Sequence, residues 1–170
     1  INEQGKVRAS FLLIARLLGD KGIREYMVAA RSIKAQYPEA EFHLVGWIDD
    51  NPSAISQQEL ETWVNDKIVN YWGKLSDVRP AIAASSVYVL PSYREGTPRT
   101  VLEAMAMGRA VITTDAPGCR ETVSHGVNGY LVAVKSVDQL VQSMQSFIED
   151  PKLMLSKVQR SPEIALSKYD

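Results

Sequence analysis

Short apolar runs alternate along this chain with longer stretches in which apolar and polar residues are mixed. The runs are rich in β-branched and aromatic residues and are bounded by Gly, Pro, Asp or Ser. Runs so short and so uniformly apolar predict strands that are covered on both faces. The predicted strands are 7–15, 41–45, 68–72, 87–90, 110–114 and 129–133.

Helical periodicity lies between these strands. Apolar residues at Ile23, Met27, Ala30, Ile33 and Tyr37 share one helical face, and this helix is expected to end before the proline at position 38. Two sequences match the capping-box pattern, 56–59 and 136–139, and predict helix starts. Further helices are predicted at 77–84 and from 98 to about 107.

Strands that alternate with helices at this spacing predict an α/β fold with parallel βαβ units. We expect a doubly wound, Rossmann-like sheet of about six strands. In such sheets ligands bind at the carboxyl ends of the strands, where the strand order reverses. The predicted binding surface therefore comprises the loops 16–22, 46–51, 72–76, 92–97 and 115–120.

Composition and charge limit the domain organisation and the kinds of partner that we expect. A chain of 170 residues with 45% hydrophobic content can bury one substantial core, and we expect a domain over 1–150 with a helical tail over 151–170. A net charge of −1 gives no reason to expect a nucleic-acid partner. The single cysteine, Cys119, excludes an intrachain disulfide and is expected to serve packing or lie in a loop. No run approaches the about 18 apolar residues of a membrane span.

The stretch 90–114, LPSYREGTPRTVLEAMAMGRAVITT, carries the candidate chemistry. Glu95 and Glu103 lie eight residues apart, one in a loop and one on the helix behind it. We expect Thr97 to cap this helix with Pro98 in its first position, although a capping box from Thr100 to Glu103 is an alternative. Carboxylates beside a helix start that favours anions suit a ligand with both hydroxyls and phosphate, such as a nucleotide sugar.

The segment from Glu95 to Glu103 and the residues after it resemble the E-x7-E motif of retaining GT-B glycosyltransferases. These belong to the large bacterial family that includes lipopolysaccharide, capsule and phosphatidylinositol mannosyltransferases. Arg16 and Lys21, in ARLLGDKG, resemble the phosphate-binding loop of its C-terminal domain. The segments ETV at 121–123 and GVNGYLV at 126–132 also match, so the resemblance covers roughly 7–150.

The resemblance implies roles for these residues. Arg16 and Lys21 would stabilise the leaving diphosphate, Glu95 would accept from donor-sugar hydroxyls, and Glu103 would accept from ribose. Gly96, Thr97, Pro98, Arg99 and Thr100 would complete the donor-binding set, and Trp72 and Gly73 would lie near the nucleobase. Without the resemblance, Arg16, Lys21 and Glu95 would be read as solvated charges. Thr97 and the loop 117–121 depart from the commoner family pattern beside the sugar pocket.

The resemblance also implies the partners. The full enzyme would need no metal or cofactor, with a UDP-sugar as substrate and a glycan or lipid-linked acceptor. Its N-terminal acceptor-binding domain would be absent from this chain, which would bind donor but not transfer it. We expect a cytoplasmic location, with the inner face of the membrane as an alternative. A nucleotide-sugar epimerase and a non-catalytic nucleotide-binding module remain as other functions, whereas GxGxxG and P-loop motifs are absent.

Overall fold

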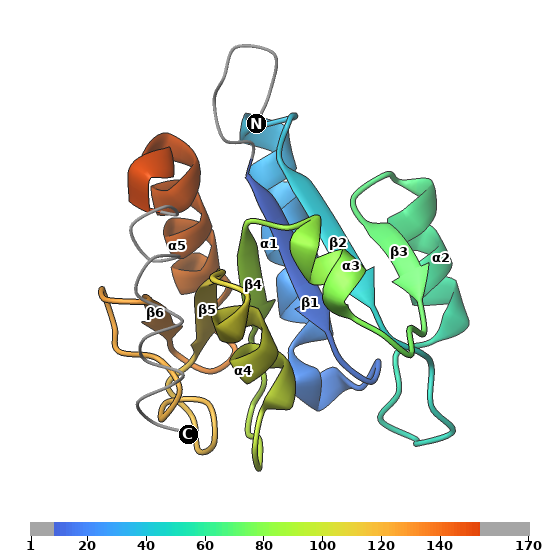
Figure 1. Ribbon diagram of the computed structural model, residues 1–170. Coiled ribbons are helices and arrows are strands. Elements are labelled where there is room, and N and C mark those ends of the chain that lie inside the picture. Colours follow the sequence, from blue (N-terminus) through green and yellow to red (C-terminus); the bar gives the residue numbers. More distant parts are fainter. Residues whose placement is uncertain (1–8, 154–170) are drawn as a thin grey trace.

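The computed structural model describes residues 9–153, which form one parallel sheet with helices on both faces (Figure 1). The six strands lie in the order β3-β2-β1-β4-β5-β6. All five strand pairings are parallel, as predicted. The strands are β1 Ser10–Ile14, β2 Glu41–Val45, β3 Asn70–Gly73, β4 Val87–Leu90, β5 Ala110–Thr114 and β6 Gly129–Val132.

Helices cover the sheet in two layers. One core cluster joins the sheet to α1, α2 and α5, and the other joins it to α3 and α4, which lie in front of the sheet in Figure 1. This is the doubly wound arrangement that the alternation of elements predicted. The helices are η1 Gly19–Lys21 (a 3-10 turn), α1 Ile23–Gln36, α2 Gln57–Asn65, α3 Arg79–Ala83, α4 Arg99–Ala106 and α5 Val137–Glu149.

The central strands β1, β4 and β5 are buried along their whole length. Successive side chains point to opposite faces, so Phe11 and Leu13 enter the α1 layer while Leu12 enters the α4 layer. This burial on both faces explains why the strands read as continuous apolar runs rather than as alternating ones.

The strands over 41–45, 87–90 and 110–114 have the predicted bounds. The third strand is displaced, because Ile68 and Val69 belong to the turn after α2. The Ile68 N–H bonds back to the Trp63 carbonyl at 3.1 Å, and Lys67 takes a positive φ of 59°. Both side chains are buried, so their apolar character reflects the core and not the sheet. The first strand is described from Ser10 onward, and residues 7–8 of its predicted span lie outside the described part.

One predicted capping box is confirmed and the other is half wrong. The Ser56 hydroxyl accepts from the Glu59 N–H at 3.1 Å, and the Glu59 carboxylate accepts from the Ser56 N–H at 3.2 Å. Ser136 likewise accepts from the Gln139 N–H at 3.2 Å. The Gln139 side chain, however, accepts from the Ala133 N–H at 2.7 Å, so it secures the end of β6 and does not complete the box.

The predicted start of α4 is wrong by one residue. Pro98 occupies the N-cap with ψ 82°, and no side chain caps the helix. The Arg99 N–H bonds to the Thr97 carbonyl at 2.9 Å, so Thr97 contributes backbone rather than its hydroxyl. The helix phase is set instead by the buried face of Val101, Ala104 and Met105. The alternative box is also wrong, because the Thr100 hydroxyl bonds to the buried Tyr88.

The strand order reverses between β1 and β4, where the chain runs outward in both directions. The loops after β1, β2, β3, β4 and β5 all leave the same edge of the sheet, at the bottom of Figure 1. Residues 154–170 of the predicted tail lie outside the described part of the chain. Within residues 9–153, no helix has the length and apolar content needed to cross a membrane.

Candidate functional site

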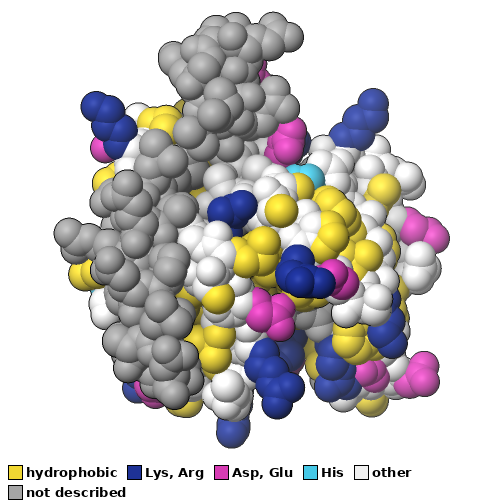
Figure 2. Space-filling view, in the orientation of Figure 1, with side chains coloured by type: hydrophobic (Ala, Val, Ile, Leu, Met, Phe, Trp, Pro, Cys, Tyr) yellow, Lys and Arg dark blue, Asp and Glu magenta, His cyan; other side chains and the backbone are white. Residues whose placement is uncertain are grey.

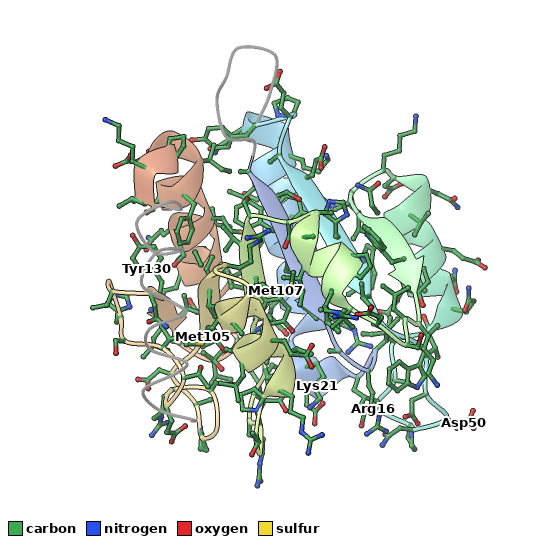
Figure 3. All side chains as sticks on the ribbon, in the orientation of Figure 1. Arg16, Lys21, Asp50, Met105, Met107 and Tyr130 are labelled. Atoms are coloured by element: carbon green, nitrogen blue, oxygen red, sulfur yellow. The ribbon has the colours of Figure 1, made fainter. Side chains whose placement is uncertain are left out.

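Two loops meet at the point where the strand order reverses. Lys21 ends the 3-10 turn after β1, and Glu95 lies in the loop between β4 and α4. The Lys21 Nζ is 3.0 Å from both carboxylate oxygens of Glu95. These side chains retain 21% and 16% of their exposure, so the pair is largely enclosed. Residues 74 positions apart thus form one charged cluster, and Figure 3 shows Lys21 at this edge.

The Glu95 loop is fixed by neighbouring strands. The buried Ser92 hydroxyl donates to Glu95 Oε1 at 2.8 Å, and the Ser92 carbonyl accepts from the Thr114 hydroxyl at 2.6 Å. The Glu95 N–H donates to the Pro117 carbonyl at 3.0 Å. Gly118 has φ +84°, and a Cβ there would lie 1.9 Å from the Glu95 carbonyl oxygen. Only glycine permits this contact between the two loops.

The Lys21 loop contacts the same segment. Gly22 has φ +74°, and a Cβ on it would lie 2.0 Å from the Pro91 carbonyl oxygen. The Tyr93 N–H donates to the Asp20 carbonyl at 2.9 Å. The loops after β1 and β4 are therefore joined by backbone as well as by the Lys21 and Glu95 side chains.

Arg16 lies apart from Lys21. Its Nε donates to the Asp49 carboxylate at 2.9 Å, and a second guanidinium nitrogen contacts the same oxygen. The Arg16 side chain is 47% exposed. The guanidinium lowers the pKa of Asp49. The two cations expected together on a diphosphate thus lie at the same edge, each on a different carboxylate (Figure 3).

Two hollows flank α4. One, of about 290 Å³, adjoins the Glu95 loop and is lined by Gly96, Thr97, Pro98, Gly118 and Glu121. The other, of about 380 Å³, lies between α4 and the start of α3 and is lined by Ser76, Asp77, Val78, Arg79, Glu103, Ala106 and Met107. Glu103 is exposed on this second hollow. Figure 2 shows Lys and Arg side chains gathering toward the same lower margin.

The Asp77–Arg79 pair in the second hollow was not singled out from the sequence. The Arg79 guanidinium donates to both Asp77 oxygens at 2.9 Å, and the Arg79 N–H donates to Asp77 Oδ1 at 3.0 Å. These contacts lower the pKa of Asp77 to about 2. An acidic residue two positions before the helix could have signalled a turn of this kind.

Trp72 and Gly73, predicted near the nucleobase, lie at the end of the edge strand. The Trp72 indole N–H donates to His43 Nδ1 at 3.0 Å, and its ring remains 37% exposed. The Gly73 carbonyl accepts from the Gly46 N–H at 3.0 Å. A Cβ at position 73 would meet nothing within 4 Å, so the space beside this glycine is open, although its φ of +77° favours glycine.

The remaining residues differ in their exposure and in their bonds. Arg99 is exposed on the first turn of α4. Cys119 is fully buried, and burial raises the pKa of its thiol, which agrees with a packing role. Ser92 and Tyr88, which the sequence presented only as loop and strand residues, both bond to predicted site residues.

Among residues 9–153, no group of three His, Cys, Asp or Glu side chains could hold a metal ion.

The chain is similar to a curated enzyme from Campylobacter jejuni, N,N'-diacetylbacillosaminyl-diphospho-undecaprenol alpha-1,3-N-acetylgalactosaminyltransferase. The two are 37% identical over 159 residues, which are 94% of this chain and 40% of the relative. A phosphatidyl-myo-inositol mannosyltransferase from Mycolicibacterium smegmatis is 28% identical over 88% of the chain and 38% of its own length. The chain thus spans less than half of these relatives.

Solved structures show the same architecture. The crystallised C-terminal domain of a glycosyl transferase group 1 family protein, LpcC from Francisella tularensis, has a TM-score of 0.84 and 29% identity. The match covers 95% of this chain and 86% of that one. TarM, at 17% identity and a TM-score of 0.84 over 99% of this chain and 34% of its own, shares the fold. The predicted Rossmann-like, C-terminal GT-B fold is therefore confirmed.

A family model described as glycosyl transferases group 1 matches residues 8–150, which include both loops of the charged cluster and both hollows. This match covers most of the chain, and the relatives carry the same family's activities in their names. The chain belongs to the group 1 glycosyltransferase family.

Proposed function

We propose that this chain is the donor-binding domain of a retaining glycosyltransferase of the E-x7-E group. The enzyme moves a hexose or N-acetylhexosamine from a nucleoside diphosphate sugar, with UDP as the nucleotide, to a glycan or lipid-linked acceptor. The acceptor-binding lobe is a further domain outside this chain. The reaction serves the synthesis of cell-surface polysaccharide on the cytoplasmic side of the membrane.

The observation that carries this proposal is the enclosed contact of Lys21 with Glu95 where the strand order reverses. A cation there offsets phosphate charge, and a carboxylate beside it accepts hydrogen bonds from sugar hydroxyls. A site for a nucleotide alone needs only the cation. The adjoining hollow of about 290 Å³ gives room for one sugar ring on the Glu95 side.

The other residues follow from this placement. Glu103, on the second hollow, accepts from the ribose hydroxyls, and the base lies toward Trp72 and Gly73. Gly96, Thr97, Pro98 and Arg99 line the path between sugar and ribose, and Thr100, whose hydroxyl bonds to Tyr88, contributes its backbone there. When diphosphate is present, the Arg16 guanidinium either leaves Asp49 or contacts Asp49 and the diphosphate together. The exposure of Arg16 allows both.

Charge builds on the diphosphate as the glycosidic bond breaks. Lys21 and Arg16 therefore stabilise the transition state more than the bound substrate, and no metal is required for this part of the chemistry. The electrophilic sugar carbon lies on the Glu95 side, and the acceptor hydroxyl approaches from the missing lobe.

The relatives support the choice of substrate class. The C. jejuni enzyme is named for N-acetylgalactosamine transfer to a diphospho-undecaprenol acceptor, and the M. smegmatis enzyme for mannose transfer to phosphatidylinositol. Both names describe a lipid-linked acceptor. The higher identity to the first favours an N-acetylhexosamine as the sugar of this chain.

The test is calorimetric titration of the purified chain with UDP, GDP and ADP, followed by UDP-N-acetylgalactosamine, UDP-glucose and GDP-mannose. We expect UDP to bind more tightly than GDP or ADP, and a UDP-sugar to bind without turnover. Preference for GDP would contradict the UDP assignment. Binding of no nucleotide would contradict the proposed function as a whole.

A further inference from the structure

Tyr88 lies on β4 with its ring fully buried in the α3 and α4 layer. Its hydroxyl is 3.0 Å from the Ile14 carbonyl, at the end of β1, and 2.6 Å from the Thr100 hydroxyl, in the first turn of α4. One side chain thus joins three elements that meet at the proposed donor site.

The location of this contact follows from the sheet. The register of β1 with β4 reaches only Leu12↔Tyr88, whereas β4 continues against β5 to Leu90↔Thr113. The pairing of β1 with β4 therefore ends at Tyr88, before the loops of Lys21 and Glu95 begin. The phenol of Tyr88 bonds to a β1 carbonyl in the region where the strand ladder has ended.

The number of available protons decides which hydroxyl donates in the contact between Tyr88 and Thr100. The Tyr88 hydroxyl has one proton, and a carbonyl oxygen can only accept. Tyr88 therefore donates to Ile14 while Thr100 donates to Tyr88. Burial raises the pKa of Tyr88, so the phenol keeps this proton. A continuous hydrogen-bonded chain runs from α4 through β4 to β1.

The first turn of α4 has backbone contacts to Thr97 and Pro98 but no side-chain cap. α4 has eight residues and no side-chain cap, and helices this short depend on tertiary contacts. Thr100 supplies a polar attachment in the first turn. Glu103 lies three residues later, on the same side of the helix.

We propose that Tyr88 is a positioning residue of the donor site, which holds the first turn of α4, and with it Glu103, in register with the end of β1. Tyr88 does not touch the donor. It acts through Thr100 on the carboxylate that lines the hollow of about 380 Å³. The inference rests on the proposed function, because it assigns Glu103 to nucleotide binding.

The chain offers a matched control in Tyr26. Tyr26 is also fully buried, and its hydroxyl donates to the His43 carbonyl at 3.0 Å. It lies in the other layer, with α1, and its hydroxyl contacts β2 rather than α4. Tyr88→Phe and Tyr26→Phe both remove a buried hydroxyl that serves a backbone carbonyl, so they separate a general loss of stability from a specific loss of binding.

The experiment measures melting temperature and UDP affinity for the parent, Tyr88→Phe and Tyr26→Phe. We expect both variants to melt lower by similar amounts, and only Tyr88→Phe to weaken UDP, by roughly three- to tenfold. In a Glu103→Gln background the Tyr88→Phe effect should disappear, because the two changes remove one coupled contribution. Thr100→Ser, which keeps the hydroxyl, should retain more affinity than Thr100→Val.

Equal UDP affinity of the two Tyr→Phe variants would overturn the inference, as would an undiminished Tyr88→Phe effect in the Glu103→Gln background. If Tyr88→Phe does not fold, the Thr100→Ser and Thr100→Val pair decides, and equal affinities of that pair would overturn it. A parent chain that binds no UDP would instead remove the proposed function, and the inference with it.

Discussion

Two cation–carboxylate pairs lie at the same edge of the sheet, and their surroundings differ. Lys21–Glu95 is largely enclosed and is fixed further by Ser92, whereas Arg16–Asp49 leaves the arginine 47% exposed. An exposed pair contributes little and exchanges partners easily. Breaking an enclosed pair by removing one member leaves the other charge without compensation. The Lys21–Glu95 pair is thus fixed in place, whereas the Arg16–Asp49 pair can exchange partners.

Removing the enclosed cation should give the largest effect. Lys21→Ala takes away a charge from the diphosphate and leaves the Glu95 carboxylate facing it. We expect UDP affinity to fall by roughly ten- to a hundredfold by calorimetry. Arg31→Ala, on α1, which breaks the exposed pair with Asp66 at the end of α2, is the control for a lost positive charge. An equal and small loss in both variants would remove Lys21 from the site.

Removing the enclosed carboxylate should affect UDP and a UDP-sugar differently. Glu95→Gln frees Lys21 from its present partner, so UDP should bind more tightly, by roughly three- to tenfold. The advantage of UDP-N-acetylgalactosamine over UDP should fall, because the sugar hydroxyls lose a charged acceptor. Parallel titrations of both ligands measure this. Weaker binding of plain UDP would show that Glu95 supports Lys21 rather than competing with the phosphate for it.

The exposed pair should give smaller changes of predictable sign. Arg16→Ala should weaken UDP by at most roughly threefold, and Asp49→Asn should strengthen it slightly, because it releases the guanidinium. Both changes should shrink as salt rises to about 1 M, where screening acts within about 3 Å. A salt-independent loss in Arg16→Ala would indicate that the arginine is enclosed by the bound nucleotide.

A third pair, between the first turns of α1 and α2, should give the smallest effect. Arg24 and Glu59 join α1 to the capping box of α2, and these contacts lower the pKa of Glu59 to about 2. A lowered pKa contributes stability above about pH 4.5 that is lost as the pH falls toward 2. Because both side chains are partly exposed, we expect Glu59→Gln to cost at most about 1 kcal/mol at pH 7.

Denaturant unfolding of the parent and Glu59→Gln at pH 7, 4.5 and 2.5 measures this contribution. The gap in unfolding free energy should shrink most between the second and third conditions. Glutamine preserves the capping-box geometry, so the comparison isolates the charge. Glu61→Gln, on the same helix, is the control. A gap that is as large at pH 2.5 as at pH 7 would show that the carboxylate acts through geometry alone.

Much of the fold was predictable from sequence because each central strand is buried on both faces. The run 110–114, for example, is apolar or β-branched throughout and favours a strand over any other structure. Ile68 and Val69 misled the prediction because buried turn residues have the same apolar character as strand residues. Thr97 misled it because local capping preference yielded to the tertiary packing of Val101 and Met105.

The site was predictable in its members but not in their pairing. Lys21 and Glu95 were identified by motif, yet their contact depends on β1 lying next to β4, which no local spacing reveals. The contact of Arg16 with Asp49 depends in the same way on β1 lying next to β2. Tyr88 gave no signal, because a tyrosine in an apolar run is indistinguishable from an ordinary core residue until its hydroxyl partners are seen.

Gly118 restricts how this site can be redesigned. Its missing side chain lets the loop after β5 lie directly against the carbonyl of Glu95, where a Cβ would come within 1.9 Å. Any other residue at 118 would push away the Glu95 backbone and with it the carboxylate, whatever its effect on the shape of the sugar hollow. Thr97 and Glu121 line the same hollow. Libraries aimed at a new donor sugar should therefore vary 97 and 121 and keep glycine at 118.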